Sequence, residues 1–129
     1  RYSLNKKIKF IQHCKEMPLA YSLADVVVST SIEPEAFGRV SVEAQSMGKP
    51  IIASNIGGSK ETIINKKTGL LYKHDDPREL AKCLNTVIQL SPDELKSLGN
   101  EGRKNITKKF DVETMCQSNL KEYRKLIKN

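Results

Sequence analysis

The chain has no tryptophan, few aromatic residues and no long apolar run. Only 5% of its 129 residues are aromatic, and they form no stacking cluster and no helix-turn-helix or RNP pattern that would suit a nucleic acid. No stretch approaches the roughly 20 apolar residues of a membrane-spanning helix. The basic start, Arg1 to Lys7, is not followed by an apolar core, so we do not expect a signal peptide there. Neither nucleic acid as a partner nor a membrane span is expected.

Cysteine is also scarce. Cys14, Cys83 and Cys116 form no CxxC pair, and three thiols cannot all be bridged within one chain. Reduced thiols are therefore expected, which favours a cytoplasmic protein. The carboxylates show no metal-ligand spacing, so the sequence predicts neither a metal nor another bound cofactor.

The charge is unbalanced, with 22 Lys and Arg against 15 Asp and Glu and a net charge of +7. Such an excess fits an anionic partner, namely nucleic acid, anionic lipid or a phosphorylated substrate. The later basic residues, however, lie opposite an apolar stripe on predicted helices, which favours solvated helix faces. The charge alone assigns no function.

The first half of the chain alternates segments typical of strands with segments typical of helices. Short continuous apolar runs predict buried strands of a parallel sheet, and a run that alternates with lysine predicts a strand before them. The predicted strands are 7–11, 25–29, 50–54 and 69–72, and the predicted helices are 18–24, 40–47 and 59–64. The pattern predicts an α/β fold with a doubly wound, Rossmann-like parallel sheet. Because such a sheet usually opens with an earlier strand and helix, we expect a unit of roughly 30 residues to be missing upstream.

The second half is predicted to be helical, with well-marked helix starts. Asp76-Pro77 and Ser91-Pro92 each place a capping residue before proline, with Glu79 and Glu94 at the third helical position. Asp111 is predicted to open a last helix. The apolar face of that helix comprises Val112, Met115, Leu120, Tyr123 and Ile127. No repeat or linker divides the chain, so we expect one domain.

Residues 29–49 form the segment best suited to chemistry. A predicted strand ends at Ser29, a loop rich in small and acidic residues follows, and a helix is predicted to begin near Arg39. Ligands of open α/β sheets bind beyond the carboxyl ends of the strands. The unpaired amides of about 37–40, with the positive end of the helix dipole, would form an anion site suited to a diphosphate.

Glu43 is an unusual residue on this predicted helix. Val40, Ala44 and Met47 define the predicted buried stripe, and Glu43 lies only about 60° from Val40 around the helix. A carboxylate at that edge needs a partner. One reading is an i,i+4 ion pair with Arg39, and the other is a pair of hydrogen bonds from vicinal ribose hydroxyls. Periodicity leaves both open.

Gly57-Gly58 is a second glycine-containing segment that deserves comparison with phosphate-binding loops. Neither a GxGxxG nor a Walker pattern is present. A structural turn is therefore favoured, placed before a helix that Ser59 is predicted to cap.

Residues 35–43, Glu-Ala-Phe-Gly-Arg-Val-Ser-Val-Glu, resemble the Glu-x7-Glu motif of the family 4 (group 1) retaining glycosyltransferases. Flanking segments agree with that family in order and spacing, and the resemblance covers nearly the whole chain. The agreeing segments are 24–29, 43–53, 57–61, 68–72 and 110–111 with the helix after it. The resemblance implies that residues 1–129 are the C-terminal, nucleotide-sugar-binding half of a two-domain GT-B enzyme, N-terminally incomplete, with its acceptor domain absent.

The resemblance also implies roles for individual residues. Glu43 would hold the ribose, and Glu35 would reach hydroxyls of the donor sugar, aligning it rather than acting as a nucleophile. Backbone amides at Phe37 and Gly38 would contact the sugar, and those at Arg39 and Val40 the diphosphate. His13 would line the base pocket, although Gln12 stands where the family often has glycine. The cationic pair that neutralises the leaving diphosphate lies, in the family, upstream of the matched region.

The implied function is transfer of a sugar, with retention, from a UDP- or GDP-linked donor to a glycan or lipid-linked acceptor. The family's commonest setting implies surface polysaccharide or lipopolysaccharide synthesis in the cytoplasm at the inner face of the membrane, with peripheral membrane contact. The same residues also fit an orphaned module that binds donor nucleotide and catalyses nothing. In either case this chain alone is expected to be inactive as a transferase.

Overall fold

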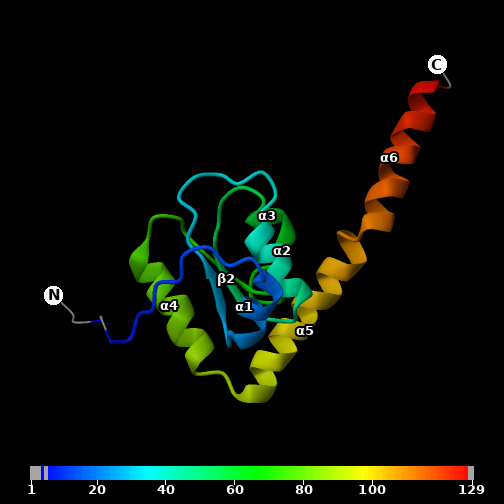
Figure 1. Ribbon diagram of the computed structural model, residues 1–129. Coiled ribbons are helices and arrows are strands. Elements are labelled where there is room, and N and C mark those ends of the chain that lie inside the picture. The colour runs from blue at the N-terminus through cyan, green and yellow to red at the C-terminus, as the bar shows by residue number, and fades with distance from the viewer. Residues whose placement is uncertain (1–3, 5, 128–129) are drawn as a thin grey trace.

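A computed structural model describes residue 4 and residues 6–127. Within them, three parallel strands form one sheet in the order β1-β2-β3 (Figure 1). The strands are β1 Val27–Ser29, β2 Ile51–Ser54 and β3 Leu70–Tyr72. Each strand lies within one of the predicted apolar runs, 25–29, 50–54 and 69–72. Val27 pairs with Ile51, and Ile52 pairs with Leu70.

Helices cover both faces of this sheet. They are α1 Met17–Leu23, α2 Arg39–Ser46, α3 Ser59–Thr62, α4 Pro77–Ile88, α5 Pro92–Lys109 and α6 Val112–Ile127. Alternate residues of β2 divide the core, with Ile51 and Ala53 in a cluster with α1 and α2, and Ile52 in a cluster with Val87 of α4. This division follows from the period of two along a strand. The predicted α/β fold with a parallel sheet is confirmed.

The predicted helix starts are present. The carboxylate of Asp76 accepts hydrogen bonds from the amides of Arg78 and Glu79, and Ser91 forms a complete capping box with Glu94. Asp111 accepts a 2.6 Å hydrogen bond from the amide of Thr114. Because these bonds satisfy first-turn amides locally, residues near in sequence were enough to predict them.

The predicted strand 7–11 is wrong. These residues have no regular structure, and Phe10 is 92% exposed. The amides of Lys7 and Ile8 donate hydrogen bonds to the carbonyl oxygen of Leu4, as in a turn. Alternating apolar residues form a strand only where a neighbouring strand supplies hydrogen bonds and another layer covers the apolar side. In the described part of the chain, β1, β2 and β3 pair only with one another.

The buried stripe of α2 also differs from the predicted one. Ala44 is buried as expected, but its buried neighbours are the polar Ser41 and Gln45, while Met47 is 36% exposed. Gln45 donates from Nε2 to the carbonyl oxygens of Ser41 (3.0 Å) and Thr62 (3.1 Å). Polar residues are buried where such partners exist, which an apolar period cannot show.

Close packing of α2 against α5 depends on glycine at the crossing. Gly99 and Gly102 are the buried α5 residues there, and a Cβ added at Gly99 would overlap the carbonyl oxygen of Gly48 and lie 3.4 Å from Cδ of Pro50. The absence of a side chain at Gly99 therefore lets the end of α2 approach the α5 backbone.

Gly99→Ala is expected to destabilise the fold by about 1–3 kcal/mol, because overpacking forces the backbone to shift. The sign of the change in stability is informative, because in an unhindered helix interior alanine is more stabilising than glycine by about 1 kcal/mol. Urea unfolding followed by circular dichroism measures the change. Asn100→Ala, at the exposed neighbouring position, is the control. A Gly99→Ala variant as stable as the control would contradict the tight contact.

The last helix forms where it was predicted, but its apolar face is not covered. Figure 1 shows α6 projecting away from the sheet and its covering helices. The predicted face is exposed throughout, at Val112, Met115, Leu120, Tyr123 and Ile127. None of the described helices combines the length and apolar character that a membrane crossing requires.

Candidate functional site

Two loops meet beyond the carboxyl ends of β1 and β2. Residues 30–38 connect β1 to α2, and residues 55–58 connect β2 to α3. The amide of Gly58 donates a 2.8 Å hydrogen bond to the carbonyl oxygen of Glu35, which joins the two loops. The site predicted after β1 is therefore formed by two loops, the second of which follows β2.

Gly57 and Gly58 make the close approach of these loops possible. Gly57 has φ +54°, and a Cβ there would lie 2.5 Å from the carbonyl oxygen of Glu35. A Cβ on Gly58 would overlap the backbone of Phe37. The predicted structural turn is present, but Ser59 does not cap α3, because Gly58 is the N-cap and no side chain bonds there. The Ser59 hydroxyl instead lies 3.3 Å from that of Ser41.

No side chain makes a capping hydrogen bond at the start of α2. Gly38, the N-cap, is buried and left-handed (φ 75°, ψ 57°), and no side-chain hydrogen bond caps the helix. A Cβ added to Gly38 would lie 3.2 Å from the amide nitrogen of Ser59 and 3.3 Å from its hydroxyl oxygen. First-turn amides without a cap, at the positive end of a helix dipole, are suited to an anion.

Glu43 lies one turn further along α2, with its side chain 34% exposed. Its Oε1 accepts hydrogen bonds from Nη2 (2.9 Å) and Nε (3.3 Å) of Arg39. Its Oε2 accepts one from the hydroxyl of Tyr21, at 3.0 Å. The ion pair weighed from the sequence is thus present, but Arg39 is 84% exposed, where such pairs contribute little. Tyr21 was not predicted, because only tertiary packing brings α1 to this helix.

Glu35 occupies the middle of the loop before α2. The hydroxyl of Ser31 donates to its carboxylate, and its side chain is partly exposed. The Gly58 amide fixes its backbone. Glu35 therefore lies just before the uncapped start of α2 and Glu43 one turn after it, and each accepts a hydrogen bond from a hydroxyl group.

Phe37 contributes a contact that the sequence did not reveal. Its ring packs edge-on against Phe110, with centroids 5.7 Å apart and an interplanar angle of 66°. Phe110 is the C-cap of α5. An edge-to-face pair of this geometry is stabilising, so the loop is supported from the junction of the two C-terminal helices.

Val40 and His13 are the remaining predicted site residues, and they lie on different segments. Val40 is partly buried in the first turn of α2, beside Arg39. His13 is exposed, on the irregular segment before α1. No group of three or more His, Cys, Asp or Glu suited to a metal ion occurs among the described residues.

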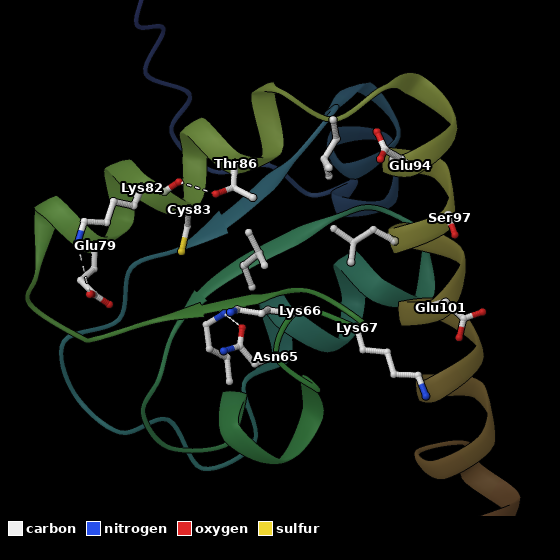
Figure 2. Close-up of a pocket in the computed structure, with 14 residues that line it drawn as sticks. Asn65, Lys66, Lys67, Glu79, Lys82, Cys83, Thr86, Glu94, Ser97 and Glu101 are labelled. Carbon is white, nitrogen blue, oxygen red and sulfur yellow. Dashed lines mark hydrogen bonds and ion pairs between the residues drawn. The ribbon is translucent and has the colours of Figure 1, made fainter.

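A cavity of about 870 Å³ lies elsewhere, between α4, α5 and the β3 side of the sheet (Figure 2). Leu70 and Leu71 contribute apolar surface, and Glu79, Lys82 and Glu101 contribute charges of both signs. Oδ1 of Asn65 accepts a 2.9 Å hydrogen bond from the amide of Leu71, which satisfies part of this sheet edge. Mixed charge around an open edge selects no ligand, so the start of α2 is kept as the candidate site.

Known proteins are similar to this chain in fold and in sequence. A glycosyltransferase of Rickettsia africae aligns with 98% of the chain at 35% identity and a TM-score of 0.90. HepE of Anabaena, solved with UDP and glucose, aligns with 95% at 30% identity and a TM-score of 0.86; it was also solved with UDP-glucose. Spore coat protein SA of Bacillus subtilis is 31% identical over 121 residues, 92% of this chain.

Each match covers only part of the related protein. The chain covers 34% of the Rickettsia protein, 33% of HepE and 32% of spore coat protein SA, so it spans about a third of each. The family model described as glycosyl transferases group 1 matches residues 1–105. This match, together with the two solved structures, shows that the chain belongs to the group 1 glycosyl transferase family.

Proposed function

We propose that residues 1–129 are the C-terminal, donor-binding domain of a retaining glycosyltransferase that uses a UDP- or GDP-linked sugar. The observation that carries the proposal is the partly exposed carboxylate of Glu43 beside the uncapped start of α2. The first feature suits a sugar diol and the second suits a diphosphate. Group 1 membership and the UDP and UDP-glucose complexes of HepE support it.

In this proposal each group binds a different part of the donor. Glu43 accepts hydrogen bonds from the ribose hydroxyls, and its exposed partner Arg39 is free to move aside. The amides at Arg39 and Val40 receive the diphosphate, and those at Phe37 and Gly38 receive the sugar. Glu35 orients the sugar hydroxyls, and His13 lies toward the base. Charge that develops on the diphosphate as the glycosidic bond breaks is then stabilised by amides already in place.

The acceptor and the setting are proposed from the relatives. CapM of Staphylococcus aureus, 29% identical over 126 residues, is a capsular polysaccharide biosynthesis glycosyltransferase. We therefore propose a glycan or lipid-linked acceptor, in surface polysaccharide or lipopolysaccharide synthesis on the cytoplasmic side of the membrane, with peripheral contact. Calorimetric titration of the chain with UDP and with GDP tests donor binding, and binding of neither would contradict the proposal.

Nucleotide binding is expected to be independent of divalent metal, because helix-terminal amides neutralise the diphosphate in place of a cation. UDP affinity measured with magnesium or manganese should equal that measured in excess EDTA. Titration of the metals into EDTA buffer without protein corrects for the heat of chelation. A large loss of affinity on chelation would instead indicate a carboxylate site among Glu33, Glu35 and Glu43.

A further inference from the structure

Tyr21 is a buried titratable residue to which no role has yet been given. It lies on α1, is 5% exposed and packs in the core cluster with Ala44 and Ile51. Its hydroxyl nevertheless reaches the edge of that cluster and donates to Oε2 of Glu43 at 3.0 Å. A residue that packs on the sheet is therefore joined directly to the carboxylate of the candidate site.

The phenol is a constant donor in this contact. Burial, and then the hydrogen bond to Glu43, raise the pKa of Tyr21 to about 12, although the charge of Arg39 lowers it. The hydroxyl thus keeps its proton at neutral pH. Its position is set by the packing of Tyr21 in the core cluster. An exposed 2.9 Å hydrogen bond from Nζ of Lys49 to the carbonyl oxygen of Ser22 also joins α1 to the loop after α2.

The two partners of Glu43 differ in how firmly they hold it. Arg39 is 84% exposed on the same helix, so its contact exchanges with solvent at little cost. Tyr21 is buried and comes from another element. A carboxylate has about four acceptor positions. Tyr21 takes one position on Oε2, so Oε2 retains one for a further hydroxyl. Arg39 takes both positions on Oε1, and because Arg39 is exposed, a ribose hydroxyl can replace one of its two bonds at little cost.

We infer that Tyr21 is a positioning residue for ribose recognition, which holds the Glu43 carboxylate so that its two oxygens face the vicinal hydroxyls. The inference rests on the proposed donor-binding function. Glutamate has three rotatable side-chain bonds, and a ligand that must order them loses affinity. The phenol orders them before the nucleotide arrives. Its effect therefore depends on the ribose hydroxyls and not on the base or the diphosphate.

The test compares UDP with its 2′,3′-dideoxy analogue by calorimetry on the 129-residue chain. Tyr21→Phe removes only the hydroxyl, and it is expected to weaken UDP roughly three- to tenfold while leaving the analogue nearly unchanged. The ratio of the two affinities is the readout. A variant that is partly unfolded lowers both apparent affinities by the same factor, so the ratio remains interpretable.

Two further variants complete the comparison. Glu43→Gln should reduce the same ratio. Tyr72→Phe removes a hydroxyl from a tyrosine that is 4% exposed in the other core cluster, and it should leave the ratio unchanged. A Tyr21→Phe variant that keeps the wild-type ratio, or loses both ligands equally, would overturn the positioning role. The same comparison is made with GDP and its dideoxy analogue if GDP is the nucleotide that binds. Failure of the wild-type chain to bind either nucleotide, or to prefer the one it binds over its analogue, would instead overturn the donor-binding proposal beneath it.

Discussion

Glu43→Gln is expected to lower the affinity for UDP or GDP about tenfold or more. A hydrogen bond to a charged acceptor contributes about 1.5–3 kcal/mol, and each 1.4 kcal/mol is a factor of ten. The amide presents one acceptor oxygen where the carboxylate presents two, so one of the two ribose hydroxyls loses its partner. In either orientation of the glutamine amide, Nε2 would face a donor, namely the hydroxyl of Tyr21 or the guanidinium of Arg39.

Calorimetric titration of both nucleotides into wild type and variant measures this loss. Glu33→Gln is the matched control, because Glu33 is an exposed glutamate on the loop before α2 and tests whether any lost negative charge changes affinity. Arg39→Gln is expected to have a small effect on ribose binding, since the exposed pair contributes little. Undiminished affinity in Glu43→Gln would show that the carboxylate serves its contacts with Arg39 and Tyr21 and not ribose binding.

The sequence predicted those parts of the fold that depend on neighbouring residues. Asp76 and Ser91 bond amides two or three positions along the chain, so local spacing revealed both helix starts. Buried strands were recognisable because a parallel sheet covered on both faces requires continuous apolar runs such as Ile51–Ser54. The start of α2 near Arg39 was also predicted locally, from the end of one apolar run at Ser29 and the loop of small and acidic residues after it.

What the sequence did not predict depends on contacts between distant segments. The hydroxyl of Tyr21 meets Glu43 across 22 positions, and Phe37 meets Phe110 only because α5 ends beside the loop. The face of α2 was misplaced because Gln45 is buried through hydrogen bonds to Ser41 and Thr62. No periodicity of apolar residues records such partners. The candidate site was therefore predicted as a segment and a motif, but its supporting contacts required the structure.

The 129-residue chain assayed alone is expected to show no measurable sugar transfer, even where it binds nucleotide. It spans about a third of the length of its relatives. Transferase rates depend on donor and acceptor held together and on charge preorganised around the leaving group. In the donor site proposed here, the diphosphate meets the backbone amides of Arg39 and Val40, and no cationic side chain has been assigned to it. Loss of one preorganised group typically lowers a rate by about 10²–10³. Loss of the surface that positions the acceptor lowers the rate further.

The measurement is release of nucleotide from UDP- and GDP-sugars, with and without a lipid-linked acceptor pool. A full-length relative such as HepE, assayed in parallel, shows that the conditions permit turnover. UDP binding by the same preparation of the chain shows that inactivity is not misfolding. Binding without turnover is the result that assigns donor recognition to these residues and acceptor positioning to others. Turnover by the chain alone at the rate of the full-length relative would place the leaving-group charge and the acceptor contacts within residues 1–129, and the division of labour proposed for this domain would be wrong.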